Sequence, residues 1–222
     1  MCGRFSFAIS DKIIEEHFGF VPVNNQARYN CAPSQLLAVI SNRHPERFSY
    51  FQWGFVPNWA KDFSVGNKMI NARAETITSK PAFKRALQTN RCLVPADSFY
   101  EWSHDSEKTP CRVMLREVPL FSMAGIWGEW TAPGNEIITT FAILTTESNI
   151  LIKQLHHRMP VIFDTKEAEN TWLNSSSVAE LQALCAPLAA EKMLFYPVSK
   201  KLNSPKNNVP DLHQSINQAS LF

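Results

Sequence analysis

The sequence has 222 residues, a formal net charge of +2, 45% hydrophobic residues and 19% charged residues. This ordinary globular balance excludes a disordered chain and the strongly basic type of protein that coats nucleic acid, so any contact with DNA must come from a local basic groove. No apolar run reaches the roughly 18 residues of a membrane span, and no signal-peptide pattern is visible. We therefore expect a cytoplasmic protein without membrane association.

The cysteines are odd in number, and none forms a C-x-x-C pair. They are Cys2, Cys31, Cys92, Cys111 and Cys185. This pattern argues against a zinc site and against the disulfide framework of a small secreted protein. Free thiols are typical of a reducing compartment. We expect no metal and no cofactor.

In chain order, the first expected element is a short amphipathic helix over residues 10–19, with Gly19 as its C-terminal stop. Residues 35–41 and 47–53 are predicted strands. Ser79 and Pro81 then open a helix that ends near Asn90.

From about residue 91 to 145 the pattern is mostly that of β-strands with polar, proline or glycine breaks. Asp164 with Glu167, and Ser177 with Glu180, form candidate capping boxes for helices near 165–173 and 177–188. Because strands come in runs, we predict an α+β fold. It is a single domain over residues 1–222, around a mainly antiparallel, barrel-like β-sheet with flanking helices.

The sequence begins Met1-Cys2-Gly3, and a small second residue permits removal of Met1. Cys2 would then carry an α-amine and a thiol on adjacent carbons, with ordinary pKa values of about 7.7–8.0 and 8.5. The amine can condense with an aldehyde to give an imine, and the thiol can close a five-membered thiazolidine on it. Alternatively, Cys2 is simply a small residue at the start of a buried strand.

Further motifs follow in order. They are Arg-Tyr-Asn-Cys-Ala-Pro at 28–33, Trp-Gly-Phe-Val-Pro-Asn-Trp at 53–59, Asn-Ala-Arg-Ala-Glu-Thr at 71–76, Arg-Cys-Leu-Val-Pro-Ala-Asp-Ser-Phe-Tyr-Glu-Trp at 91–102, and His-His-Arg-Met-Pro at 156–160. With the Cys-Gly-Arg-Phe start, this ensemble resembles the SOS response-associated peptidase family, also called SRAP or abasic-site-processing proteins. The resemblance runs nearly end to end, to the segment around residues 197–203.

The resemblance implies the SRAP fold and an enzyme that binds single-stranded DNA containing abasic sites. Such an enzyme forms a thiazolidine DNA–protein crosslink with the ring-opened abasic-site aldehyde, shielding the lesion in the DNA damage (SOS) response. It also implies autocatalytic removal of Met1, and lyase activity is a further candidate. Replication-fork or 3′-junction DNA is a further candidate partner, and DNA binding would associate this cytoplasmic protein with the nucleoid. We expect a monomer. The residues that the resemblance assigns to catalysis are Cys2, Asn71, Glu101 and His156.

Another set of residues is assigned to DNA binding: Arg4, Asn30, Pro33, Trp59, Arg73 and Arg158. Arginines at positions 4 and 73 suit phosphate oxygens, because guanidinium binds them bidentately. Trp59 either stacks on a base or caps the core. Ala60 stands where some family members have a second Trp. Lys80, Lys84 and Arg85 form a small basic cluster that is typical of a solvated helix face.

Imine formation needs proton transfers, for which a carboxyl and an imidazole are the usual agents. Glu101 lies between Tyr100 and Trp102 on a predicted strand, an apolar setting that would raise its pKa. Alternatively it points to solvent. His156 has a second imidazole, His157, beside it.

Three other functions remain open. The first is an N-terminal-nucleophile hydrolase of the glutamine amidotransferase type, which also starts Met-Cys-Gly but normally continues with a glycine-rich strand. The second is a cysteine peptidase with Cys2, His156 and Glu101 as a triad. The third is a non-catalytic module that binds single-stranded DNA.

Overall fold

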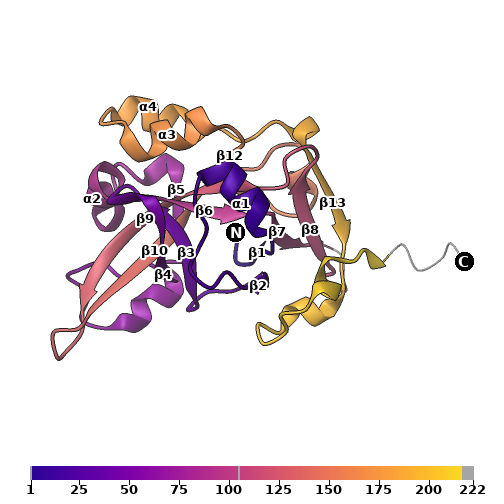
Figure 1. Ribbon diagram of the computed structural model, residues 1–222, viewed down its shortest axis with the longest axis horizontal. Coiled ribbons are helices and arrows are strands. Elements are labelled where there is room, and N and C mark those ends of the chain that lie inside the picture. Colours follow the sequence, from indigo (N-terminus) through magenta and orange to yellow (C-terminus); the bar gives the residue numbers. More distant parts are fainter. Residues whose placement is uncertain (1, 105, 217–222) are drawn as a thin grey trace, which may run out of the picture.

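A computed structural model describes residues 2–104 and 106–216 (Figure 1). The expected loss of Met1 concerns a residue outside these ranges. The strands are β1 (Phe5–Phe7), β2 (Arg28–Cys31), β3 (Leu36–Ser41), β4 (His44–Trp53), β5 (Asn71–Arg73), β6 (Arg91–Ala96), β7 (Ser98–Trp102), β8 (Pro110–Leu115), β9 (Phe121–Thr131), β10 (Ile137–Glu147), β11 (Arg158–Pro160), β12 (Ile162–Phe163) and β13 (Met193–Pro197). The helices are α1 (Asp11–Phe18), α2 (Pro81–Thr89), α3 (Lys166–Asn174) and α4 (Val178–Ala183).

Five strands close into a barrel. Following the hydrogen bonds from β10 to β4, β3, β6 and β9 leads back to β10. Every pairing in this ring is antiparallel except β10 with β4, which is parallel. The predicted α+β fold around a mainly antiparallel, barrel-like sheet with flanking helices is therefore confirmed. In Figure 1, α2 and the α3–α4 pair lie outside the barrel strands.

A second sheet has the strand order β13-β8-β7-β1-β2. Its central strands β7 and β8 pair antiparallel, and β1 lies between β7 and β2. The link between the two sheets is short, because β6 ends at Ala96 and β7 begins at Ser98. Asp97 is thus the residue at which the chain passes from the barrel to the second sheet.

Barrel strand β6 shows how the core is divided. All six of its residues are buried. Cys92 and Val94 belong to the main core cluster with Trp53, Trp127 and Phe141, whereas Leu93 packs with residues of α2 and α3 such as Leu87 and Trp172. Successive side chains of a strand point to opposite faces, so a strand covered on both faces is apolar throughout.

The first two expected helices are confirmed. Helix α1 ends at Phe18, and Gly19 takes a left-handed conformation with φ 82°, as a C-terminal glycine stop requires. Helix α2 starts with Pro81 in its first turn and has Asn90 as its C-cap. No helix among the described residues is long and apolar enough to cross a bilayer.

The predicted capping of the later helices is partly wrong. Thr165, not Asp164, is the N-cap of α3, and its side chain accepts a hydrogen bond from the Ala168 amide. Asp164 instead pairs with Lys192 at 2.5 Å. Ser177 caps α4 as expected, but α4 ends at Ala183 rather than near residue 188. The N-cap of α3 differs from the prediction because Asp164 forms an ion pair with Lys192, a residue too distant in the sequence for the local pattern to indicate.

Arg91, at the start of β6, joins α2 and α3 to the barrel. Its buried guanidinium donates only to backbone carbonyls, and these belong to Leu87, Gln88, Trp172, Leu173 and Ser175. Such carbonyls at helix C-termini have no partner within the helix. A positive charge there also complements the helix dipoles. One side chain therefore caps two helices.

We predict that Arg91→Met lowers the free energy of unfolding by more than about 3 kcal/mol, because it leaves several buried carbonyls unpaired. Urea unfolding of the variant and the wild type measures this difference. As a control, Arg47→Met on exposed β4 should change stability by less than about 0.5 kcal/mol. Equal, small losses in both variants would contradict the capping role.

Candidate active site

The candidate site lies where the start of the chain meets the end of β7. Strand β1 pairs with β7 with Phe5 opposite Phe99, and the Tyr100 amide donates to the Arg4 carbonyl at 2.9 Å. Because the strands are antiparallel, the residues before β1 run toward the Glu101 end of β7. The structure thus brings Cys2 and Glu101 together.

Cys2 is buried, with no solvent-exposed surface. The Asn71 side-chain amide, at the start of β5, donates to the Cys2 carbonyl oxygen at 2.9 Å. Burial and the nearby charge of Glu101 raise the pKa of the Cys2 thiol well above its usual range. Both effects favour the protonated thiol.

The Asn71 side chain has a second polar atom in the site. Its Oδ1 is buried and has no hydrogen-bond partner among the described residues. An amide whose N–H₂ already holds the Cys2 backbone can use this oxygen to accept a hydrogen bond from a bound group.

Burial raises the pKa of Glu101 to about 7. The side chain is only 4% exposed, so the prediction of an apolar setting is confirmed and the alternative that it points to solvent is wrong. A carboxyl with this pKa can give or take a proton near neutral pH.

His156 lies just before β11, and its pKa is shifted in the opposite direction to that of Glu101. Burial, together with the charges of His157 and His104, lowers its pKa to about 4. Its Nδ1 accepts a hydrogen bond from the Arg158 amide at 2.9 Å, which assigns the proton of the neutral ring to Nε2. The rings of His156 and His157 stack with centroids 4.3 Å apart.

Strand β10 holds two of the predicted motifs. On one edge it pairs with β5, placing Thr145 opposite Arg73, and on the other it pairs with β11, placing Glu147 opposite Arg158. A cavity of about 360 Å³ opens beside these strands, and it is lined by Arg73, Glu147, Ser148, Lys153, His157 and Arg158. Arg73 is exposed there, as a phosphate contact requires.

Arg4 and Asn30, which were predicted to bind DNA, bind each other and the C-terminal part of the described chain. Arg4 Nη1 donates to Asn30 Oδ1 at 2.8 Å and to the Leu202 carbonyl at 2.7 Å. Asn30 is buried, and its Nδ2 donates to the Leu202, Ser204 and Asn207 carbonyls. In this structure both side chains tie β1 and β2 to the segment that follows β13.

The remaining three differ in exposure. Arg158 is buried and makes a two-pronged ion pair with Glu75, at 2.8 and 2.9 Å. Pro33 is half-buried in the turn after β2. Trp59 is 66% exposed, so it is not a cap on the core, and it lines a separate cavity of about 520 Å³ with Arg43 and Arg85.

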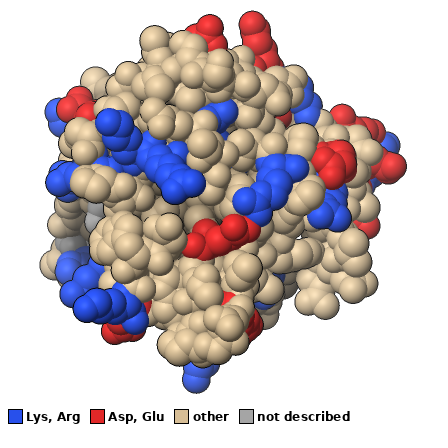
Figure 2. All heavy atoms as spheres, turned by 90° about the vertical axis from the view of Figure 1, so that its left-hand side faces the viewer, with Lys and Arg blue, Asp and Glu red and all other residues tan. Residues whose placement is uncertain are grey.

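Four lining residues of the Arg73 cavity were missed from the sequence: Glu147, Ser148, Lys153 and His157. Lys153 and His157 come from the turn that precedes β11, and only the basic character of residues 153–158 signalled them. On the face that carries α2, Figure 2 shows basic side chains in separate groups with acidic side chains between them. Basic character on that face is therefore local, in keeping with the low net charge.

This arrangement, a buried cysteine at position 2 held by an asparagine beside a glutamate, can be compared with known proteins. The family model described as "SOS response associated peptidase (SRAP)" matches residues 1–205. The chain belongs to the SRAP family.

Two curated relatives are named as abasic site processing proteins. The chain is 44% identical to the "Abasic site processing protein YoqW" of Bacillus subtilis, over 97% of this chain and 100% of that protein. It is 31% identical to the mouse (Mus musculus) "Abasic site processing protein HMCES", over 95% of this chain and 75% of that protein. A crystal structure of a Bacteroides thetaiotaomicron protein superposes with a TM-score of 0.87, at 30% identity, covering 96% of this chain and 99% of that one.

The raised pKa of Glu101 makes a prediction about stability. The folded state disfavours the ionised carboxyl, so a stability cost appears as pH rises above the unfolded value of roughly 4.3 and is complete above about 7. At pH 8, Glu101→Gln should therefore have a free energy of unfolding that exceeds that of wild type by on the order of 3 kcal/mol, and a higher unfolding temperature. At pH 4 the two should differ little, and an equal difference at both pH values would disprove the burial effect.

Proposed function

We propose that this SRAP protein binds single-stranded DNA at abasic sites and bonds covalently to the lesion through Cys2. The observation that carries this proposal is the setting of Cys2. Its carbonyl oxygen accepts a hydrogen bond from Asn71, and the charge of the buried Glu101 lies close enough to raise the pKa of its thiol. The names of the relatives, "abasic site processing protein", support the same substrate.

The reaction begins at the α-amine of Cys2, which is freed when Met1 is removed. The amine adds to the aldehyde carbon of the ring-opened abasic sugar, and loss of water leaves an imine. The Cys2 sulfur then bonds to the imine carbon while the thiol proton moves to nitrogen, closing a thiazolidine. The raised pKa of the thiol favours this order, because a neutral thiol leaves the first attack to the amine.

Glu101 and His156 divide the proton transfers. With its pKa near 7, Glu101 can protonate the leaving hydroxyl of the carbinolamine. Its carboxylate can then take back a proton from the nitrogen as the imine forms. His156 stays neutral, with a proton on Nε2 that can be donated to a sugar or phosphate oxygen. Asn71 Oδ1 can accept a hydrogen bond from the Cys2 nitrogen.

The thiol's protonated state also bears on the alternative hydrolases. A glutamine amidotransferase or a cysteine peptidase attacks with sulfur and needs a thiolate. Burial and the charge of Glu101 oppose a thiolate at Cys2. A glutaminase assay would detect the first of these activities directly.

The mechanism predicts a three-way pattern with an abasic single-stranded oligonucleotide. Wild type should give an adduct that survives denaturation without reductant. Cys2→Ser should give an imine that is retained only after borohydride reduction, because a hydroxyl closes the ring poorly. A protein with a blocked N-terminus should give neither product. Denaturing electrophoresis and intact mass measure all three, and a stable adduct from the blocked protein would refute the N-terminal mechanism.

We further propose that Arg73 binds a phosphate of the strand from its exposed position in the cavity beside β10. Arg73→Ala should weaken binding of intact and abasic single strands alike, and should reduce the log–log salt slope by about 0.7. Arg116→Ala is a matched control, because Arg116 is also exposed but lies far along β8 from the candidate site. Cys111 at the start of β8 pairs with Glu101, whereas Arg116 follows the last residue of that strand. An unchanged salt slope for Arg73→Ala would exclude the phosphate contact.

A further inference from the structure

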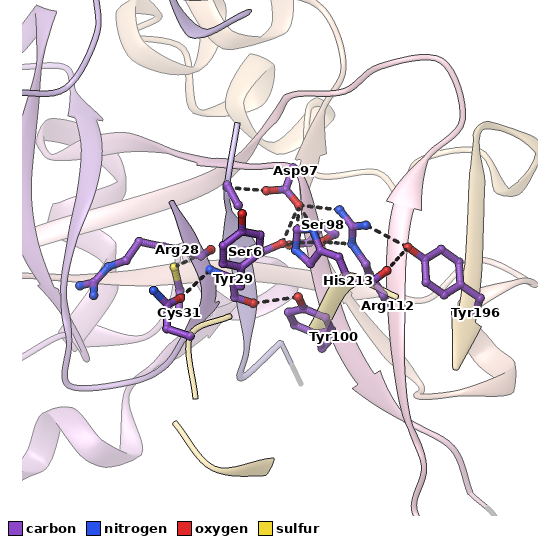
Figure 3. A network of polar contacts seen from close by, with 12 residues as sticks. Ser6, Arg28, Tyr29, Cys31, Asp97, Ser98, Tyr100, Arg112, Tyr196 and His213 are labelled. Atoms are coloured by element: carbon purple, nitrogen blue, oxygen red, sulfur yellow. Dashed lines mark hydrogen bonds and ion pairs between the residues drawn. The ribbon is translucent and has the colours of Figure 1, made fainter. Parts of the chain in front are cut away.

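A buried carboxylate outside the candidate site holds the strand that carries Cys2. Asp97 Oδ2 accepts a hydrogen bond from the Ala8 amide at 2.6 Å, and Oδ1 accepts one from Ser6 Oγ at 2.6 Å. The Asp97 amide also donates to the Ser6 carbonyl at 3.0 Å. Asp97 therefore binds the β1 segment at three points (Figure 3).

The same carboxylate is fixed from the other side. Arg112 of β8 donates from Nη2 to Asp97 Oδ1 at 2.9 Å and from Nε to Ser98 Oγ at 2.8 Å. Its Nη1 donates to the Tyr196 hydroxyl of β13, which in turn donates to the His213 carbonyl. The His213 ring lies 3.7 Å from Asp97.

Every strand of the second sheet contributes to this network, since the His213 ring also packs edge-on against Tyr29 of β2. Burial lowers the pKa of His213 to about 4, so at neutral pH its ring is uncharged and Arg112 is the cation that balances Asp97. Asp97 is only 4% exposed, and a buried carboxylate with this many donors is held in one place.

Strand β1 needs such an anchor. It is only three residues long, and its pairing with β7 is defined at two positions, Phe5 with Phe99 and Ser6 with Ser98. Its pairing with β2 is irregular between Phe5 and Phe7. A strand this short has little backbone pairing to specify its register.

We propose that Asp97 is a positioning residue for the Cys2 nucleophile: by binding Ser6 and Ala8 it sets the place of β1 along β7, and so holds Cys2 beside Glu101 and Asn71. The inference rests on the proposed function of Cys2. In this proposal Asp97 contacts neither the DNA nor the reacting atoms, but it determines the position of Cys2 relative to Glu101 and Asn71. Misplacement of a reacting group by about 1 Å can cost about 100-fold in rate.

The test compares two buried carboxylates. Glu169 is 3% exposed and binds His17 of α1 and Ser122 of β9, neither of which belongs to β1. Asp97→Asn should lower the maximal rate of stable adduct formation at saturating abasic DNA by about 10–100-fold, and leave the half-saturating DNA concentration unchanged. A larger share of its adduct should need borohydride, because the displaced thiol closes the ring more slowly.

Glu169→Gln should lose thermal stability but keep the wild-type maximal rate, measured well below its unfolding temperature. Ser6→Ala removes the hydrogen bonds of the Ser6 hydroxyl to Asp97 and Ser98 without leaving a buried charge unpaired, so it should slow the reaction in the same way by a smaller factor. This variant carries the test if Asp97→Asn does not fold.

The outcomes separate the two hypotheses. If wild type forms the adduct and Asp97→Asn or a folded Ser6→Ala reacts at the wild-type rate, the positioning role is overturned and the proposed function stands. Equal slowing in Glu169→Gln would also overturn it, because a general loss of stability would then be the cause. If wild type itself forms no adduct, the proposed function falls and the inference with it.

Discussion

Strand β10 is hydrogen-bonded along both edges, and the barrel and the candidate site both depend on this pairing. Its first half closes the barrel between β9 and β4. Its second half continues beyond the barrel and pairs with β5 and β11. These two short strands carry Asn71, Arg73 and Arg158, and the second begins two residues after His156. One long strand thus connects motifs that are about 85 positions apart in the sequence.

Burial is the common cause of the electrostatics at the candidate site. It raises the pKa of the Cys2 thiol and of Glu101, and it lowers the pKa of His156. All three shifts favour the neutral form, as removal of water always does. A site of neutral, buried groups suits a condensation in which protons move at each step, and it suits poorly a reaction that starts from a free thiolate.

The periodic and punctuated parts of the fold could be predicted from the sequence. Helix α1 with Gly19, helix α2 with Pro81 and the strands from residue 91 onward follow from local patterns. The setting of Glu101 was also predictable, because Tyr100 and Trp102 flank it. What could not be predicted were long-range partners: Lys192 for Asp164, Glu75 for Arg158, and the Leu202 carbonyl for Arg4. The residue type shows which groups a side chain can bind, but only the folded structure shows which of them lies within bonding distance.

The bonds from Arg4 and Asn30 to Leu202 and Ser204 join the two ends of the described chain. During synthesis these contacts cannot form until residues 202–204 have left the ribosome. The same holds for His213 beside Asp97. A nascent chain therefore carries Cys2 for most of its translation without the contacts that hold the strand following it, and these contacts are complete only after residue 213 has been added.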